Sequence, residues 1–169
     1  MAHRAAAVTK GPGVKRVSLI GVVDRSFVAS NAHELARMKA LVARLSDKQL
    51  AAMVNEYWSV AGILGHIAFW DGRALFLAGK LQRGEPFTPS DNDPEDVDWI
   101  NDSSRPLIQA IAPRALAELA VSIAEETDQL VASLPDELLA SLGETSPLNL
   151  ERAGHRGEHL DEIEASNFG

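Results

Sequence analysis

Four segments of the chain repeat their apolar residues at the three- and four-residue spacing of an α-helix. In the first, from about Ser30 to Leu45, the apolar positions are Leu35, Met38, Leu41, Val42 and Leu45. Similar stripes recur over about 59–81, 113–134 and 148–165. Each stripe needs a neighbour to cover it, and no pair of segments alternates like paired strands. The sequence therefore predicts an all-α fold, a four-helix bundle.

Local signals mark several helix boundaries. Ser59 is a good N-cap for the second helix, and Gly84 with Pro86 ends it. Pro113 suits the first turn of the third helix. Ser46, followed by Gln49, has the spacing of a capping box. A further short helical piece is expected over 136–142.

The connection over 82–112 is too long for a tight helical hairpin. We expect it to cross the end of the bundle, so that the helices before and after it run parallel. The residues near Val97–Gln109 are compatible with a helix inside this crossover.

The charge distribution separates an N-terminal extension from the predicted bundle. The net charge is −8, yet residues 1–28 hold five basic residues against one acidic residue. We expect residues 1–28 to be a flexible extension, in which Gly11-Pro12-Gly13 interrupts regular secondary structure, and residues 29–169 to be the bundle. An acidic body argues against nucleic-acid binding. No apolar run approaches the ~20 residues that span a bilayer, so we expect a cytoplasmic protein that does not bind membranes.

Three histidines are the residues most suggestive of chemistry. His155 and His159 stand four residues apart, which places both rings on one side of a helix. His66 lies on the apolar stripe of the second helix. A bundle can bring such faces together around one ion, although a lone core histidine is more often structural. Three nitrogen ligands with an open fourth position are typical of a catalytic metal site.

The ligand types alone do not identify the metal. Neutral imidazoles bind zinc, nickel and iron, and zinc is the first choice for three such ligands. The chain has no cysteine, which excludes thiolate ligands and a cysteine nucleophile.

Three other residues are weaker candidates. Glu158 completes the pattern H-x-x-E-H with His155 and His159, in which the glutamate of inverted zinc proteases is the general base. Only ten residues follow His159, so a protease is set aside and Glu158 is more simply a solvated helix residue. Trp70 is a candidate wall of a cofactor pocket or a core residue, and Arg73 is a candidate contact for an anionic substrate or a surface residue.

Two segments resemble the DinB-like superfamily, which includes mycothiol-dependent maleylpyruvate isomerases and bacillithiol or mycothiol transferases. The first is Trp58-Ser59-Val60-Ala61-Gly62-Ile63-Leu64-Gly65-His66-Ile67-Ala68-Phe69-Trp70, which matches W-S-V-x-x-x-L-x-H-x-x-x-W. The second is His155-Arg156-Gly157-Glu158-His159, which matches the closing H-x-x-x-H helix. The likeness covers about residues 30–165.

The resemblance implies a four-helix bundle with a crossover between helices two and three. It also implies a divalent metal, often zinc, on His66, His155 and His159. Relatives of this kind use the metal to activate the thiol of a low-molecular-weight cofactor, such as mycothiol or bacillithiol. We therefore expect transfer of such a thiol to an electrophilic small molecule.

Two other functions stay open at this point. One is a non-catalytic bundle that binds or sequesters a small molecule, and the other is a metal-assisted hydrolase that needs no thiol. A homodimer through a helix pair is compatible with a bundle of this size, but the sequence does not indicate the face.

Overall fold

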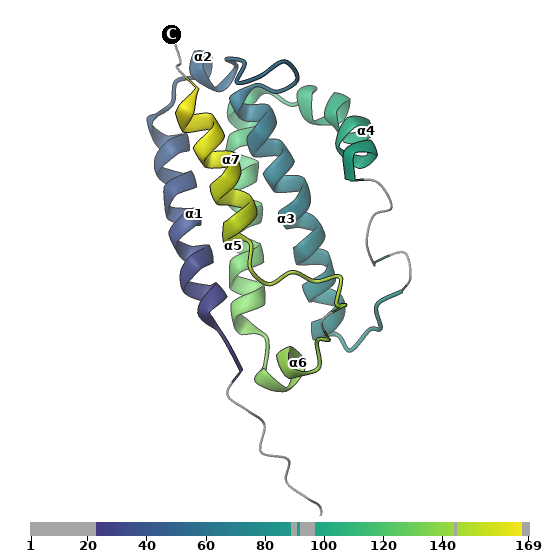
Figure 1. Ribbon diagram of the computed structural model, residues 1–169. Helices are drawn as coiled ribbons and strands as arrows, with labels where there is room; N and C mark the ends of the chain where they lie inside the picture. The colour runs from purple at the N-terminus through teal and green to yellow at the C-terminus, as the bar shows by residue number, and fades with distance from the viewer. Residues whose placement is uncertain (1–22, 89–90, 92–96, 144, 167–169) are drawn as a thin grey trace, which may run out of the picture.

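The computed structural model describes residues 23–88, 91, 97–143 and 145–166. The regular secondary structure of the described residues is helical, apart from one isolated bridge between Met53 and Ser59. Four long helices lie side by side (Figure 1), which confirms the predicted bundle: α1 (Ser26–Arg44), α3 (Val60–Gln82), α5 (Pro113–Ser133) and α7 (Ala153–Ala165). Three further helices, α2 (Asp47–Leu50), α4 (Val97–Gln109) and α6 (Asp136–Ala140), lie in the connections.

The crossover is confirmed by the direction of the helices. In Figure 1, α3 and α5 both run from the α2 end of the bundle toward the α6 end, and α1 and α7 run the opposite way. The α4 helix occupies the described part of the connection between α3 and α5 and packs against α3. The α3–α5 pair makes the most extensive contact in the bundle.

Several predicted helix boundaries are confirmed at the exact residue. The Ser59 hydroxyl accepts a hydrogen bond from the Gly62 amide and caps α3. Ser46 and Gln49 form the predicted capping box of α2. Pro113 is the first residue of α5. These signals depend on neighbours in the sequence, so the sequence alone can place them.

The last helix begins at Ala153 rather than near residue 148, and the reason is a contact from another helix. The side-chain oxygen of Asn31 in α1 accepts hydrogen bonds from the amides of Arg152 and Ala153, at 2.7 and 3.1 Å. The Glu151 carboxylate accepts another from the Gly154 amide. These acceptors take the place of a preceding helical turn.

The bundle begins before residue 29. Residues 1–22 of the predicted extension lie outside the described residues, but α1 starts at Ser26 and Phe27 is buried. Arg25 pairs with Asp136 and donates to the carbonyls of Ala132 and Leu134. This short segment is therefore part of the fold.

Among the described helices, α3 alone is long and apolar enough to cross a membrane. Of its most apolar window, 67% is buried inside the bundle. This is the burial expected for the core helix of a soluble protein.

Gly65 permits the close approach of α3 to both α4 and α5. A Cβ at this position would lie 2.6 Å from Ile108 Cγ2 and 2.8 Å from Leu116 Cδ1. We expect Gly65→Ala to lower the free energy of unfolding by about 1–3 kcal/mol, because those side chains must move within a packed core. Urea unfolding measures this change.

Gly72→Ala in the same helix is the matched control. Its new Cβ would lie in ordinary contact, 3.9 Å from Ile123 Cγ2. The better helix propensity of alanine should leave that variant as stable as the wild type or more stable, by up to about 1 kcal/mol. Equal stability of the Gly65 and Gly72 variants would contradict the close approach.

Candidate metal centre

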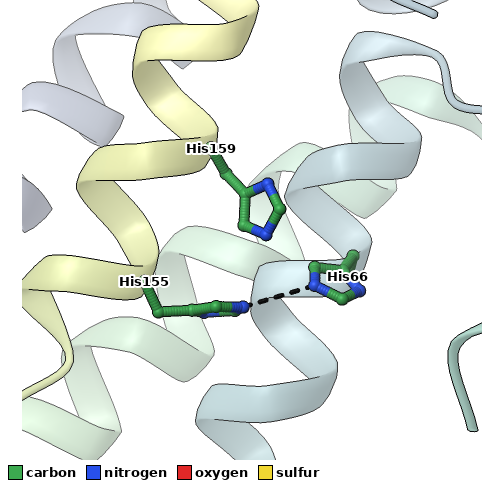
Figure 2. Close-up of side chains that lie close together, drawn as sticks. All are labelled: His66, His155 and His159. Atoms are coloured by element: carbon green, nitrogen blue, oxygen red, sulfur yellow. Dashed lines mark hydrogen bonds between the residues drawn. The ribbon is translucent and has the colours of Figure 1, made fainter. Parts of the chain in front are cut away.

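The structure brings the three histidines together. His66 comes from the middle of α3, and His155 and His159 come from consecutive turns of α7 (Figure 2). One ring nitrogen of each residue lies within 4.8 Å of the other two. The Nε2 atoms of His66 and His155 are 3.3 Å apart, a hydrogen bond in which one ring donates and the other accepts.

Burial keeps two of these rings neutral. It lowers the pKa of His66 to about 4, and the nearby His159 lowers it further. Burial also lowers the pKa of His155 to about 3, with smaller contributions from His159 and Arg152. Metal ligation requires the neutral imidazole. Both rings are therefore in this neutral form throughout the physiological pH range.

The same shifts predict a loss of stability in mild acid for the metal-free protein. Unfolded histidines bind protons near pH 6.5, whereas the folded His66 and His155 do so only near pH 4 and pH 3. Between those values the unfolded state binds more protons, so the free energy of unfolding falls as the pH falls. Urea unfolding in EDTA at about pH 7.5, 6.5 and 5.5 measures the slope.

His33→Gln serves as the control for this titration. It removes an imidazole that is 73% exposed on α1, outside the cluster, and should keep the wild-type slope. A free energy of unfolding that stays constant between about pH 6.5 and 5.5 would contradict the buried, neutral state of the two histidines.

The histidines line a cavity of about 480 Å³. Trp58, Ile63 and Trp70 form its apolar walls. The rings of Trp58 and Trp70 lie 5.9 and 6.4 Å from the His66 ring. Trp58 precedes α3, and Trp70 lies one turn after His66. Trp70 thus lines this cavity, and its predicted role in binding a cofactor stays a prediction. The sequence pattern alone did not indicate this place for Trp58.

Arg73 lies outside this cavity. It lines a neighbouring cavity of about 890 Å³ that shares Trp70 and Val97 with the first. Its guanidinium donates to the carbonyls of Pro147 and Asp91, at 3.2 and 2.5 Å. Arg73 thus ties the crossover to the segment before α7, and its predicted contact with an anionic ligand stays a prediction.

The acidic residue beside the histidines is Glu162, not Glu158. Glu158 is exposed and does not line the cavity. Glu162 lines it, and its Oε2 lies 3.5 Å from His159 Nδ1. That nitrogen is buried and has no hydrogen-bond partner among the described residues. Metal-binding histidines commonly present their outer nitrogen to a carboxylate, so this pair fits a ligand role for His159.

The donor set fits a divalent ion. It consists of three imidazole nitrogens, two of them held neutral, around a cavity large enough for a further ligand. The three side chains could therefore hold a divalent metal ion.

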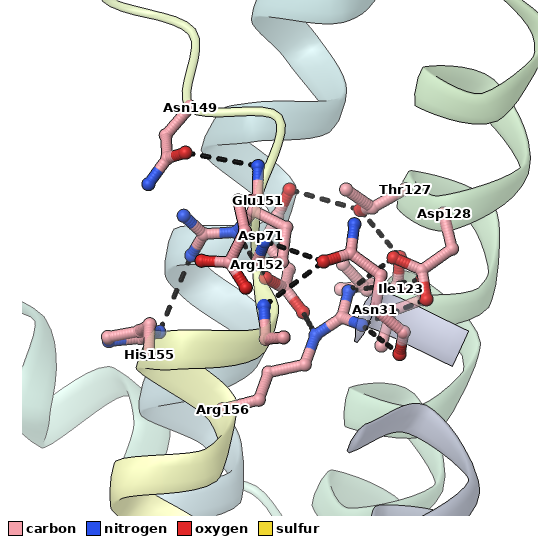
Figure 3. A network of polar contacts seen from close by, with 12 residues as sticks. Asn31, Asp71, Ile123, Thr127, Asp128, Asn149, Glu151, Arg152, His155 and Arg156 are labelled. Carbon is pink, nitrogen blue, oxygen red and sulfur yellow. Dashed lines mark hydrogen bonds and ion pairs between the residues drawn. The ribbon is translucent and has the colours of Figure 1, made fainter. Parts of the chain in front are cut away.

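A buried network of charged residues supports the helix that carries two of the histidines (Figure 3). Asp71 of α3 is fully buried and accepts from Arg152 Nε and Arg156 Nε, both at 2.8 Å. Arg156 is also fully buried and pairs with Asp128 of α5 at 2.9 Å through both terminal nitrogens. The network connects α3, α5 and the start of α7.

Each arginine of this network has a distinct environment. Burial disfavours the charged form of Arg156, but the bonds to Asp128 and the charge of Asp71 outweigh it and raise its pKa above the ordinary value. Arg152 Nη2 lies 3.4 Å from His155 Nδ1, so the network reaches the histidine cluster directly. The sequence interpretation missed these residues. For two of them the sequence does hold a signal. Asp71 lies four residues after Ile67, and Arg156 lies four residues before Leu160, which places both on the apolar stripes of their helices.

An all-helical bundle with three histidines from two helices around one cavity defines the class as a candidate metal-binding helical bundle. A family model described as the DinB superfamily matches residues 32–160, which is more than half of the chain. The chain therefore belongs to the DinB superfamily. No curated protein and no solved structure gives a significant match.

Proposed function

We propose that the protein is a metal-dependent enzyme in which His66, His155 and His159 bind one divalent ion, with zinc as the first choice over nickel and iron. The convergence of the three ring nitrogens within 4.8 Å carries this proposal. Zinc accepts three nitrogen ligands in tetrahedral geometry and keeps a fourth position for a reactant.

The proposed reaction is the transfer of a low-molecular-weight thiol to an electrophilic small molecule. Membership of the DinB superfamily supports it, with mycothiol and bacillithiol as the candidate thiols. The bound ion would supply Lewis acidity that favours the thiolate over the thiol. In the transfer, the thiol gives its proton to solvent, the sulfur forms a bond to the electrophilic carbon, and the bond from that carbon to the leaving group breaks, so that the leaving group departs with the electron pair.

The chain's own residues fit the supporting roles. The protein has no cysteine, so a sulfur nucleophile must arrive with a cosubstrate. A cavity of about 480 Å³ has the size of a small-molecule site. Trp58 and Trp70 provide apolar walls that exclude water, and the Glu162 carboxylate faces His159 Nδ1 at 3.5 Å.

Thiol-dependent loss of a chloro-aromatic electrophile tests the reaction. We expect zinc-loaded protein to consume 1-chloro-2,4-dinitrobenzene with mycothiol or bacillithiol, and His159→Ala to lose this activity. Turnover that needs metal but no thiol would indicate a hydrolase instead. Zinc binding without turnover by any low-molecular-weight thiol would contradict thiol transfer and leave the metal site standing.

A further inference from the structure

One end of the histidine cavity is lined by hydrogen-bond donors that lack acceptors. Arg152 stands there at the start of α7 and is 7% exposed. Its Nε donates to Asp71, and its Nη2 lies beside His155 Nδ1. Its Nη1 has no hydrogen-bond partner in the described part of the chain. A buried guanidinium that faces a cavity with an unused edge is suited to an anion.

Two asparagines add donors to the same end. The Oδ1 of Asn101 accepts from Trp70 Nε1 at 3.1 Å, and the Oδ1 of Asn149 accepts from the Glu151 amide at 3.1 Å. Both of those partners can only donate, which fixes the orientation of the two amide groups. In each asparagine the NH₂ group is therefore available to donate to a ligand. Both line the cavity, and Figure 3 shows Asn149 beside Arg152.

The opposite end of the cavity has the opposite character. Glu162 lies ten residues after Arg152, which is about 15 Å along the α7 axis, with His155 and His159 between them. Its Oε1 accepts from Asn55 and its Oε2 faces His159. A negative group is therefore repelled at the Glu162 end and attracted at the Arg152 end.

The helix start itself does not supply the donors. The amides of Arg152, Ala153 and Gly154 are already bonded to Asn31 and Glu151. The anion contact is thus made by side chains. The charges of Arg152 and Arg156 are balanced by those of Asp71 and Asp128, so the anion contact depends on the unused donors rather than on excess positive charge. A second negative charge on the ligand would meet no opposite charge there.

We infer that the cavity takes a small-molecule substrate with a carboxylate group, bound by Arg152 and Asn149 at one end. The apolar body of that ligand lies against Trp70, and its reactive atom points toward the histidines. The inference rests on the proposed function for the chemistry at the histidines, whereas the donors are present without a metal. It adds a substrate class, singly charged carboxylates, to the proposed reaction.

Benzoate, with benzamide as its neutral counterpart, tests this site through the fluorescence of Trp58 and Trp70 in the cavity wall. We expect benzoate to quench saturably in EDTA-treated protein and benzamide to bind at least about tenfold more weakly. Arg152→Gln should weaken benzoate binding by about tenfold or more. Asn149→Ala, on an exposed residue that does not threaten folding, should weaken it by about threefold.

One control variant and the zinc dependence of benzoate binding separate the possible outcomes. Arg44→Gln removes an arginine of α1 that is 57% exposed and lines neither cavity, and it should leave benzoate binding unchanged. Equal binding of benzoate and benzamide, or wild-type affinity in the Asn149 variant, would overturn the inference. Benzoate binding that requires zinc and vanishes in His159→Ala would also overturn it, because the ion would then hold the carboxylate. Failure to bind zinc, with benzoate binding intact, would overturn only the proposed function.

Discussion

Replacing Asp71 with alanine is expected to lower the free energy of unfolding by about 3–5 kcal/mol. The side chain is fully buried and accepts from two arginines at 2.8 Å each. Its removal leaves Arg152 without its acidic partner and Arg156 with Asp128 alone, and the Arg156 guanidinium is too buried to be solvated in compensation. Urea unfolding with zinc absent measures the loss.

Two further variants show that burial, not the ion pair alone, causes this effect. Asp71→Asn keeps the shape but removes the charge, so it should cost less than alanine and more than a surface substitution. Asp161→Asn is the matched control, because Asp161 pairs with Arg37 at 2.7 Å but is 72% exposed. Its loss should cost under about 1 kcal/mol. Similar losses for Asp71→Ala and Asp161→Asn would contradict the proposed role of the buried network.

The second large effect is expected on metal affinity. His159→Ala removes one of three nitrogen donors, and we expect zinc affinity to fall by on the order of 100-fold or more. His159 is the preferred ligand to substitute because its side chain is 23% exposed, so its removal disturbs packing less than removal of the buried His66 side chain does. Competition with a chromophoric chelator measures the affinity.

His33→Ala removes an exposed histidine of α1 and controls for adventitious binding by surface imidazoles. It should bind zinc as tightly as the wild type. Zinc should also raise the unfolding temperature of the wild type and of His33→Ala, but not that of His159→Ala, because only a folded site gains from the ligand. Equal affinity of the two variants would place the metal elsewhere.

The parts of the fold predicted from the sequence are those that depend on neighbours in the chain. The caps at Ser46 and Ser59 and the first turn at Pro113 are short-range features, and the structure places each as expected. The start of α7 depends on Asn31, which is more than 100 residues away, so no local pattern reveals it.

The candidate site shows the same division. The spacing of His155 and His159 requires only a helix, and the place of His66 on the apolar stripe of another helix indicated the third member. The resemblance implied the same three residues. The pairing of Asp71 with two arginines depends on how α3 and α7 pack, which periodicity does not specify. Likewise, the bond between Trp70 and Asn101 exists because α4 docks beside α3. Sequence patterns thus identified the histidines but not the residues that support them.

The measurement that tests the central claim most directly is the metal content of untagged wild-type protein, purified without chelator and analysed by mass spectrometry beside His66→Ala. The three-histidine site predicts about one equivalent of zinc, nickel or iron in the wild type and a loss of that metal in the variant. A wild-type protein that contains no metal and takes up none when zinc is added would contradict the claim that these histidines form a metal centre.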